Sequence, residues 1–114
     1  MAKLDQYRKV VQTALSKYAQ MRSGLSSNLD LELQTLFDIQ HDHYQLVYVG
    51  WHQNKRVYGP ILHLDIKNEK VWFQLNTTED DISQDLMELG VPKEDIVLGF
   101  HSPYMRQFTE FAVG

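Results

Sequence analysis

The sequence predicts an α+β protein with an N-terminal helix, an antiparallel meander of about four strands, and C-terminal helices with a short extra strand. Three observations support this fold class. Apolar residues recur every three or four positions between residues 4 and 18, which is the period of an amphipathic helix. From residue 29 to residue 76 the period changes to two, as in half-buried strands. After residue 78 helix-start signals return. The length suits one domain, and we expect residues 1–114 to form it.

The first helix carries its apolar residues on one face. They follow steps of three and four and are Leu4, Tyr7, Val11, Ala14, Leu15 and Tyr18. The opposite face is polar, so we expect the helix to bury one side only. It should end near Met21, because the turn-rich segment 23–28 follows. Basic residues flank the apolar stripe without forming one ridge along it, which favours a solvated helix surface over a contact with a phosphate backbone.

Four strands are expected at residues 29–39, 44–51, 56–67 and 70–76. A turn at 53–55 joins the second strand to the third, and the two-residue turn 68–69 joins the third to the fourth. The second turn predicts the register of the last hairpin. On its mixed face Asp65 pairs with Trp72 and His63 with Gln74. The other face is wholly apolar and pairs Ile66 with Val71, Leu64 with Phe73, and Leu62 with Leu75. Gly50, Gly59 and Gly99 indicate bulges or close backbone approach.

The C-terminal part alternates helix-start and helix-stop signals. The segment 78–81 (Thr-Glu-Asp-Asp) predicts a helix start whose three acids lie in the first turn, where the helix dipole favours negative charge. A buried stripe and a stop at Gly90 follow. Pro92 favours a further short helical turn, and residues 96–100 predict a short strand. Ser102 is expected to cap a helix that begins at Pro103. Apolar residues continue almost to Gly114, so we expect the C-terminus to be docked.

Composition excludes several classes of protein. With no cysteine there is no disulfide framework, thiolate zinc site or cysteine nucleophile. The apolar runs are too short to span a membrane, and the first residues lack the apolar stretch of a signal peptide, so we expect a cytoplasmic location. The net charge of −4 has the opposite sign to that of a typical free-standing DNA-binding module. Residues 1–22 carry a local charge of +4 and residues 76–95 a local charge of −6, which would guide assembly with a partner or draw the two segments together.

Three short motifs carry candidate chemistry, and each has a simpler structural explanation. His41-Asp42-His43, with Asp38 upstream, has a spacing that permits metal binding, but a polar turn is favoured. Asp65-Ile66-Lys67 has the acid–x–Lys form of metal-dependent nucleases, in which the carboxylate holds the cation and the lysine helps to activate water. That chemistry needs another acid on an adjacent strand, for which the candidates are Asp38 and Asp42. Neither has a spacing that marks it for this role, so solvated strand residues are favoured. His101-Ser102 lacks a nucleophile elbow. We expect no catalytic residue, no metal site and no cofactor.

Aromatic side chains on the predicted sheet indicate an interface. The rings on its two faces include Tyr48, Trp51, Tyr58 and Trp72, and the helices of so small a protein can cover only one face. A second copy or a different protein would cover the other face, or the C-terminal helix covers it internally. The acidic helix region offers a second contact surface, formed by Glu79, Asp80, Asp81 and Asp85.

The sequence resembles the XisI family over essentially its whole length. The segments that carry the resemblance are His43–Leu46, Val49–Trp51, Arg56–Gly59, Leu62–Lys67, Leu89–His101, Ser102–Tyr104 and Arg106–Val113, together with the opening Leu4-Asp5-x-Tyr7. The resemblance implies a cyanobacterial fdxN element excision controlling factor. Such factors are required, with a companion XisH protein, for a site-specific recombinase to excise a DNA element during heterocyst development. The family supplies no catalytic residues that could be assigned to this sequence.

Taken with the residues themselves, the resemblance leads us to expect a non-enzymatic accessory protein in DNA recombination. It would act by protein–protein contact with an XisH-like protein and the recombinase machinery, and would touch nucleic acid only indirectly. A homo-oligomer through the aromatic face is a further expectation. Two alternatives stay open: a metal-dependent nuclease that uses Asp65 and Lys67, and a direct DNA-binding excision factor that uses the N-terminal bases.

Overall fold

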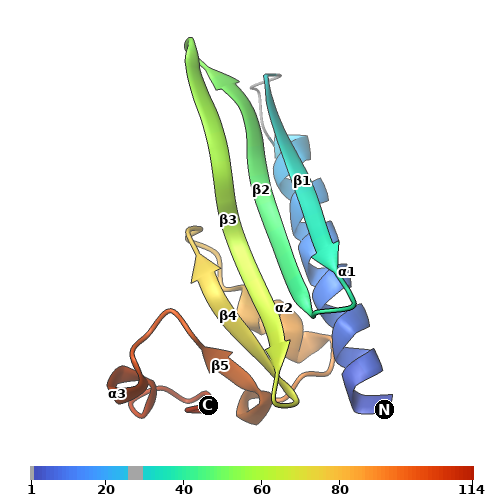
Figure 1. Cartoon of the computed structure of the whole chain (residues 1–114), viewed down its shortest axis with the longest axis vertical. Helices are drawn as coiled ribbons and strands as arrows, with labels where there is room; N and C mark the ends of the chain where they lie inside the picture. The colour runs from blue at the N-terminus through green and yellow to red at the C-terminus, as the bar shows by residue number, and fades with distance from the viewer. Residues whose placement is uncertain (1, 26–29) are drawn as a thin grey trace.

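Two helices lie on one side of a five-stranded sheet in the computed structural model, which describes residues 2–25 and 30–114 (Figure 1). The sheet order is β1-β2-β3-β4-β5. The elements are α1 (Ala2–Leu25), β1 (Leu31–Asp38), β2 (His43–His52), β3 (Lys55–Lys67), β4 (Lys70–Asn76), α2 (Ile82–Glu88), the 3₁₀ turn η1 (Lys93–Asp95), β5 (Ile96–Leu98) and α3 (Pro103–Arg106). This arrangement confirms the predicted α+β class. No helix of the described residues is long and apolar enough to cross a membrane.

The helix α1 covers the sheet with the predicted apolar stripe. Its buried residues pack with α2 against one face of β2, β3 and β4, and they are Tyr7, Val10, Val11, Ala14, Leu15 and Tyr18. The predicted end near Met21 was wrong, because the helix continues to Leu25. Ser23 and Gly24 each cost about 1 kcal/mol or less inside a helix, too little to end one that is already formed. The rest of the predicted loop, 26–28, and the predicted first strand residue, Leu29, lie outside the described residues.

Both hairpin turns of the long strands have two residues. Gln53 and Asn54 in the first turn, and Asn68 and Glu69 in the second, all have positive φ angles between 50° and 65°. Positive φ at both central positions is the geometry of the type I′ turn, whose twist matches that of the flanking strands. The second turn is the predicted one. The first is one residue shorter than predicted, so that Lys55 already belongs to β3.

Two bulges interrupt the sheet. The predicted register of the β3–β4 hairpin is confirmed for Asp65 with Trp72, Ile66 with Val71 and Leu64 with Phe73. It was wrong beyond that point, where His63 pairs with Leu75 and Leu62 with Asn76, because Gln74 is an extra residue. A second bulge lies between β2 and β3. There Leu46 pairs with Leu62 and Val47 with Pro60, which leaves Ile61 as the extra residue. A bulge changes which residues share a face, and these two decide where the polar side chains of β3 lie.

The C-terminal segment folds back over β5 and over Trp72, near the start of β4. Ser102 caps α3 by accepting a hydrogen bond from the Met105 amide at 3.3 Å, and Pro103 is the first helical residue, as predicted. The helix has only four residues, so the later aromatic residues 108 and 111 lie beyond it. The Ala112 amide donates to the Ile96 carbonyl at 2.8 Å, which adds a bridge to the sheet beyond β5. The prediction of a docked C-terminus is therefore confirmed.

Candidate functional site

The face of the sheet turned away from α1 and α2 carries the candidate site. On β2 the alternate residues His43, Gln45, Val47, Val49 and Trp51 lie on this open face. Tyr44, Leu46 and Tyr48, which alternate with them, pack on the core. Two groups of side chains can be told apart along it. A cluster of histidines with one aspartate lies near the β1–β2 turn, and aromatic side chains lie at the far end of the β2–β3 hairpin.

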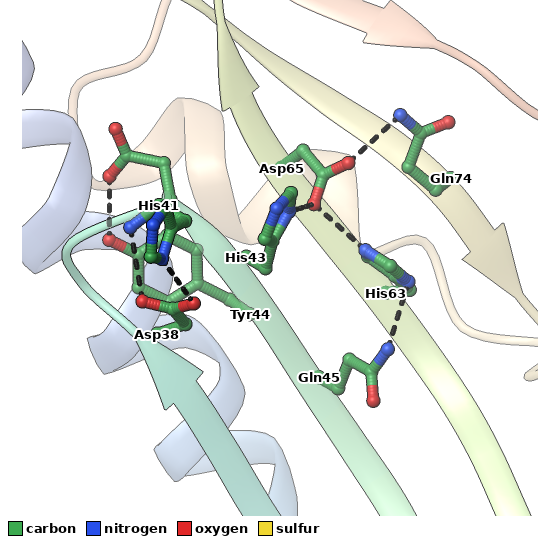
Figure 2. Close-up of polar contacts among 9 residues, drawn as sticks. Asp38, His41, His43, Tyr44, Gln45, His63, Asp65 and Gln74 are labelled. Carbon is green, nitrogen blue, oxygen red and sulfur yellow. Dashed lines mark hydrogen bonds and ion pairs between the residues drawn. The ribbon is translucent and has the colours of Figure 1, made fainter.

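The histidine cluster consists of His43, His63 and Asp65. The side chains of His43 on β2 and of His63 and Asp65 on β3 point toward one another (Figure 2). Asp65 Oδ1 accepts hydrogen bonds from His43 Nδ1 and from His63 Nε2, each at 2.8 Å. Two amides surround these groups. Gln74 Nε2 donates to Asp65 Oδ2 at 3.1 Å, and Gln45 Nε2 lies 3.1 Å from His63 Nδ1.

The hydrogen bonds of the cluster change its titration. Burial alone would raise the pKa of Asp65, whose side chain is only 15% exposed, but the hydrogen bonds from His43, His63 and Gln74 lower that pKa below its ordinary value. The hydrogen bond to Asp65 raises the pKa of His43, and the negative charges of Asp65, Asp38 and Asp42 act in the same direction. The cluster therefore keeps a carboxylate ionised between two imidazoles.

The bulge at Ile61 creates this cluster. Counting back from the turn, where His52 pairs with Lys55, an uninterrupted hairpin would place His43 opposite Leu64. The extra residue moves the register by one, so that His43 pairs with Asp65. The sequence shows the alternation of His63 and Asp65 on one face, and from it we predicted solvated strand residues. It does not show which residue of β2 faces them, which is why sequence reasoning missed the cluster.

The described structure does not bring His41 and His43 together, the disfavoured alternative that their spacing permits. Asp42, between them, has a φ of 60°, so this segment is a turn and not the extended chain on which both histidines would point the same way. His41 Nδ1 pairs with Asp38 Oδ2 at 2.9 Å, which agrees with the favoured interpretation of a polar turn. Asp42 turns toward α1, where its carboxylate accepts from Arg8 Nε at 2.8 Å and from the Tyr44 hydroxyl at 3.0 Å.

The acid–x–Lys pair of the nuclease alternative does not converge on one point. Lys67 Nζ lies 4.7 Å from the centre of the Trp72 ring, whereas Asp65 is engaged by histidines. The strand residues that pair beside Asp65 are His43 and Trp72. The two acids considered as a second metal ligand are engaged elsewhere, Asp38 with His41 and Asp42 with Arg8. The geometry thus supplies imidazole groups where that chemistry needs a second carboxylate.

The aromatic end of the hairpin is exposed. We call Trp51, Arg56 and Tyr58 the tip surface, because they flank the turn at the far end of β2 and β3 (Figure 1). Trp51 is 51% exposed and Tyr58 72%, and the Arg56 guanidinium lies 5.4 Å from the centre of the Trp51 ring. Within the described residues, β4 pairs with β3 only from Leu62 onward, so the strand edge beside Tyr58 has no strand partner on that side. Open strand edges are common sites of protein association.

The other two aromatic residues predicted for the interface lie elsewhere. Tyr48 belongs to the core face and packs against the hydrophobic core. Trp72 is on the open face but only 8% exposed. The Arg106 guanidinium lies 5.1 Å from the centre of its ring, and a Cβ placed on Gly114 would lie within 4 Å of the same ring. The C-terminal segment thus covers Trp72 internally, so Trp72 needs no second protein to cover it, and the tip surface is left uncovered.

Two of the four predicted acidic residues stabilise the local fold through hydrogen bonds. Asp81 is the N-cap of α2 and accepts a hydrogen bond from the Ser83 amide at 3.1 Å, so the prediction of three acids in the first helical turn was wrong. Asp80 accepts from the Tyr18 hydroxyl at 2.7 Å and so joins this segment to α1. Asp85 lies on α2, where burial and then the charges of Glu88 and Asp81 raise its pKa. All four predicted acidic residues, including Glu79, are on the exposed surface.

Fold and site together define a single-sheet α+β protein that covers one face of its sheet with helices and leaves a histidine–aspartate cluster and a tip surface on the other. The model of the XisI family, described as XisI protein, matches residues 1–113, and the chain belongs to this family. A search of curated proteins found no match.

Two crystal structures from Anabaena variabilis ATCC 29413 share the fold. A XisI-like protein is 40% identical with a TM-score of 0.87, and the match covers 97% of this chain and 99% of that protein. The fdxN element excision controlling factor XisI is 36% identical with a TM-score of 0.83, and the match covers 98% of this chain and 99% of that protein. These likenesses confirm the family and the fold expected from the sequence.

Proposed function

We propose that this chain controls the excision of a DNA element of the fdxN type without catalysing a reaction itself. The observation that carries the proposal is its 36% identity, over 98% of its length, with the fdxN element excision controlling factor XisI. In this role the chain contacts an XisH-like protein and, through it, the recombinase machinery. The net charge of −4 supports an indirect contact with nucleic acid, because binding to a phosphate backbone depends on positive charge.

The tip surface is the proposed contact for the partner. Trp51 and Tyr58 are large, exposed side chains on the β2–β3 hairpin, and such residues often dominate the binding energy of protein interfaces. The open strand edge beside Tyr58 offers backbone groups to a partner strand. Arg56, stacked near Trp51, adds a guanidinium that can bind a carboxylate.

The acidic segment, by which we mean Glu79, Asp80, Asp81 and Asp85, is the proposed second contact. Glu79, Asp80 and Asp81 line a cavity of about 220 Å³ that Phe73 and Phe111 also line. Negative charge beside apolar surface suits a basic side chain with an apolar stem. By covering a basic, DNA-binding surface of the partner, this segment would regulate the partner's access to DNA.

Co-expression with an XisH-like protein from the same genome tests the proposal, with size-exclusion chromatography and light scattering as the measurement. We expect a stoichiometric complex. The double variant Trp51→Ala/Tyr58→Ala should weaken it by at least tenfold in Kd, since the loss of a single hot-spot residue worth about 1.4 kcal/mol already does so. The matched control is Tyr104→Ala/Phe108→Ala, which removes two equally exposed aromatic side chains (67% and 66%) from the C-terminal segment and should leave the Kd unchanged.

Three outcomes contradict the proposal. One is that the chain elutes separately from the XisH-like protein, either as a monomer or as a homo-oligomer that does not bind it. Another is an equal loss of affinity in both double variants, which would show that the tip surface is not the specific contact for the partner. The third is DNA binding by the isolated chain that weakens steeply with salt, which would favour a direct DNA-binding factor.

The acidic segment needs variants that leave the fold intact. Asp80 and Asp81 hold Tyr18 and the start of α2, so replacing them tests folding as much as binding. Glu79→Gln/Asp85→Asn removes two negative charges and spares both contacts. We expect this variant to bind the XisH-like protein more weakly at low salt and equally at high salt, where charges are screened. Equal binding at all salt concentrations excludes the acidic contact.

A further inference from the structure

We propose that His43, His63 and Asp65 bind a divalent transition-metal ion of the Zn²⁺ class on the open face of the sheet. This proposal goes beyond the contact with a partner, and it does not depend on that contact. One donor atom from each residue lies within 4.8 Å of the donors of the other two. The three residues come from two adjacent strands whose register the bulge at Ile61 fixes.

The donor atoms of the three residues lie close enough together to converge on one ion. Both histidine nitrogens already point at the same carboxylate oxygen, each 2.8 Å from it (Figure 2). Zinc binds nitrogen and oxygen at about 2.0–2.2 Å in a tetrahedral arrangement, which places neighbouring donor atoms about 3.3 Å apart. The ion would take the place of the hydrogens that the imidazoles now share with Asp65. Each histidine nitrogen would move away from Asp65 Oδ1 by about half an ångström, and the two nitrogens, which lie within 4.8 Å of one another, would settle about 3.3 Å apart.

The surrounding amides supply the outer contacts that metal ligands require. Gln74 already donates to the second oxygen of Asp65, which orients the carboxylate and leaves Oδ1 for the ion. Gln45 lies against His63 Nδ1. When His63 binds the ion through Nε2, its remaining proton is on Nδ1. A rotation of the Gln45 amide group would turn its oxygen toward Nδ1, so that Gln45 accepts a hydrogen bond from His63.

Charge and exposure at the cluster favour a cation. Asp38 is hydrogen-bonded to His41 and is not counted as a ligand, but it pairs with His43 across β1 and β2, so its negative charge lies on the neighbouring strand. Lys67, two residues after Asp65 on the same face of β3, has its ammonium group over the Trp72 ring. Asp65 is mostly buried and His43 is exposed, so the site has a fixed base and an open side on which water or a partner's side chain can complete the coordination.

The donor set selects the class of ion. Two imidazoles and one carboxylate suit zinc, nickel, copper and ferrous iron, whereas magnesium and calcium prefer oxygen ligands alone. Three protein ligands with an open position are typical of sites that bind a further group. We therefore expect Zn²⁺ to bind with a stoichiometry of one and Mg²⁺ to show no binding.

Isothermal titration calorimetry of the metal-free full chain with ZnCl₂ tests the site, with MgCl₂ titrated in parallel. His63→Ala and Asp65→Asn should each lower the Zn²⁺ affinity at least a hundredfold, and Gln45→Ala about tenfold, as outer contacts of metal ligands do. The matched control is His41→Ala. His41 lies two residues from His43 but binds Asp38, so this variant should keep the full affinity.

A thermal unfolding series keeps the test independent of any folding defect in the variants. At Zn²⁺ concentrations about a hundred times the Kd, the melting temperature of the unaltered chain should rise by roughly 10 °C, while that of Asp65→Asn should not respond. Circular dichroism confirms that each variant is folded. The proposal is overturned if Zn²⁺ leaves the melting temperature of the unaltered chain unchanged, or if His41→Ala loses affinity as His63→Ala does.

Discussion

Asp95 joins the start of α1 to the turn that precedes β5. Its carboxylate accepts a hydrogen bond from the Tyr7 hydroxyl and pairs with Lys3 Nζ at 3.1 Å. The Tyr7 ring is buried, so Asp95→Ala leaves its hydroxyl without this partner, at a cost of about 1–3 kcal/mol. Loss of the partly exposed pair with Lys3 adds at most about 1 kcal/mol. We expect the free energy of unfolding at neutral pH to fall by about 2–3 kcal/mol.

Urea unfolding followed by circular dichroism measures this loss. For a chain of 114 residues it corresponds to a decrease in Tm of roughly 10 °C. Tyr7→Phe is the matched variant, because it removes the donor and leaves Asp95 paired with Lys3, at a cost of about 1 kcal/mol. The double variant Tyr7→Phe/Asp95→Ala should lose less than the sum of the two, because it has no hydroxyl left without a partner.

The pH dependence gives the same argument a second test. Burial alone would raise the pKa of Asp95, but the hydrogen bonds from Tyr7 and Lys3 hold it below its ordinary value. A lowered pKa in the folded state stabilises the protein above the unfolded-state pKa of about 3.9, and this stabilisation is lost as the pH falls through the folded-state pKa. The difference between the unaltered chain and Asp95→Ala should therefore stay constant from neutral pH to about pH 5 and shrink below about pH 4. A difference under about 0.5 kcal/mol at neutral pH, or one that does not shrink in acid, would refute this reasoning.

Two further predictions concern the backbone. A Cβ at Gly50 would lie 2.0 Å from the Asp30 carbonyl oxygen, whereas one at Gly59, with nearly the same φ, would meet nothing within 4 Å. Gly50→Ala should therefore destabilise the chain by at least about 2 kcal/mol more than Gly59→Ala in thermal unfolding, and equal losses would contradict the close approach. At α2, Asp81→Ala should cost about 1 kcal/mol through the lost N-cap, and Glu79→Gln less than about 0.5 kcal/mol. A larger loss for Glu79→Gln would show that the cap has been assigned to the wrong residue.

The helices and strands could be predicted because their signals are local. The stripe on α1 and the alternation in β3 and β4 are read from side-chain periods, and the Asn68-Glu69 turn set the register next to it correctly. Ser102 and Pro103 likewise act within one helical turn. The prediction of where α1 ends was wrong, because Ser23 and Gly24 disfavour the helix only weakly and the hydrogen bonds of the long helix outweigh them.

The candidate site could not be predicted because it depends on the bulges. One inserted residue changes the face of every residue beyond it, and neither bulge has a unique sequence signal. Pro60 was a local signal of the bulge at Ile61, since proline has no amide hydrogen to donate to a neighbouring strand and is found at bulges. Without the bulge at Ile61, His43 would not lie opposite Asp65. The sequence therefore predicted solvated strand residues at His63 and Asp65 and gave no reason to group them with His43. The internal cover of Trp72 also depends on contacts between distant segments.

The proposed metal site and the tip surface share one face of the sheet, which links the two proposals physically. Along β2 the open-face positions run from His43 through Gln45, Val47 and Val49 to Trp51, so a partner that lies along the hairpin would also cover the open side of the cluster. A side chain of that partner could then complete the coordination of the ion. In that case Zn²⁺ would tighten the complex, and by linkage the partner would tighten Zn²⁺ binding by the same factor. If the partner contacts the tip alone, the two affinities would be independent. Measuring the Zn²⁺ affinity of the chain with and without the XisH-like protein therefore shows how far along the hairpin the interface extends.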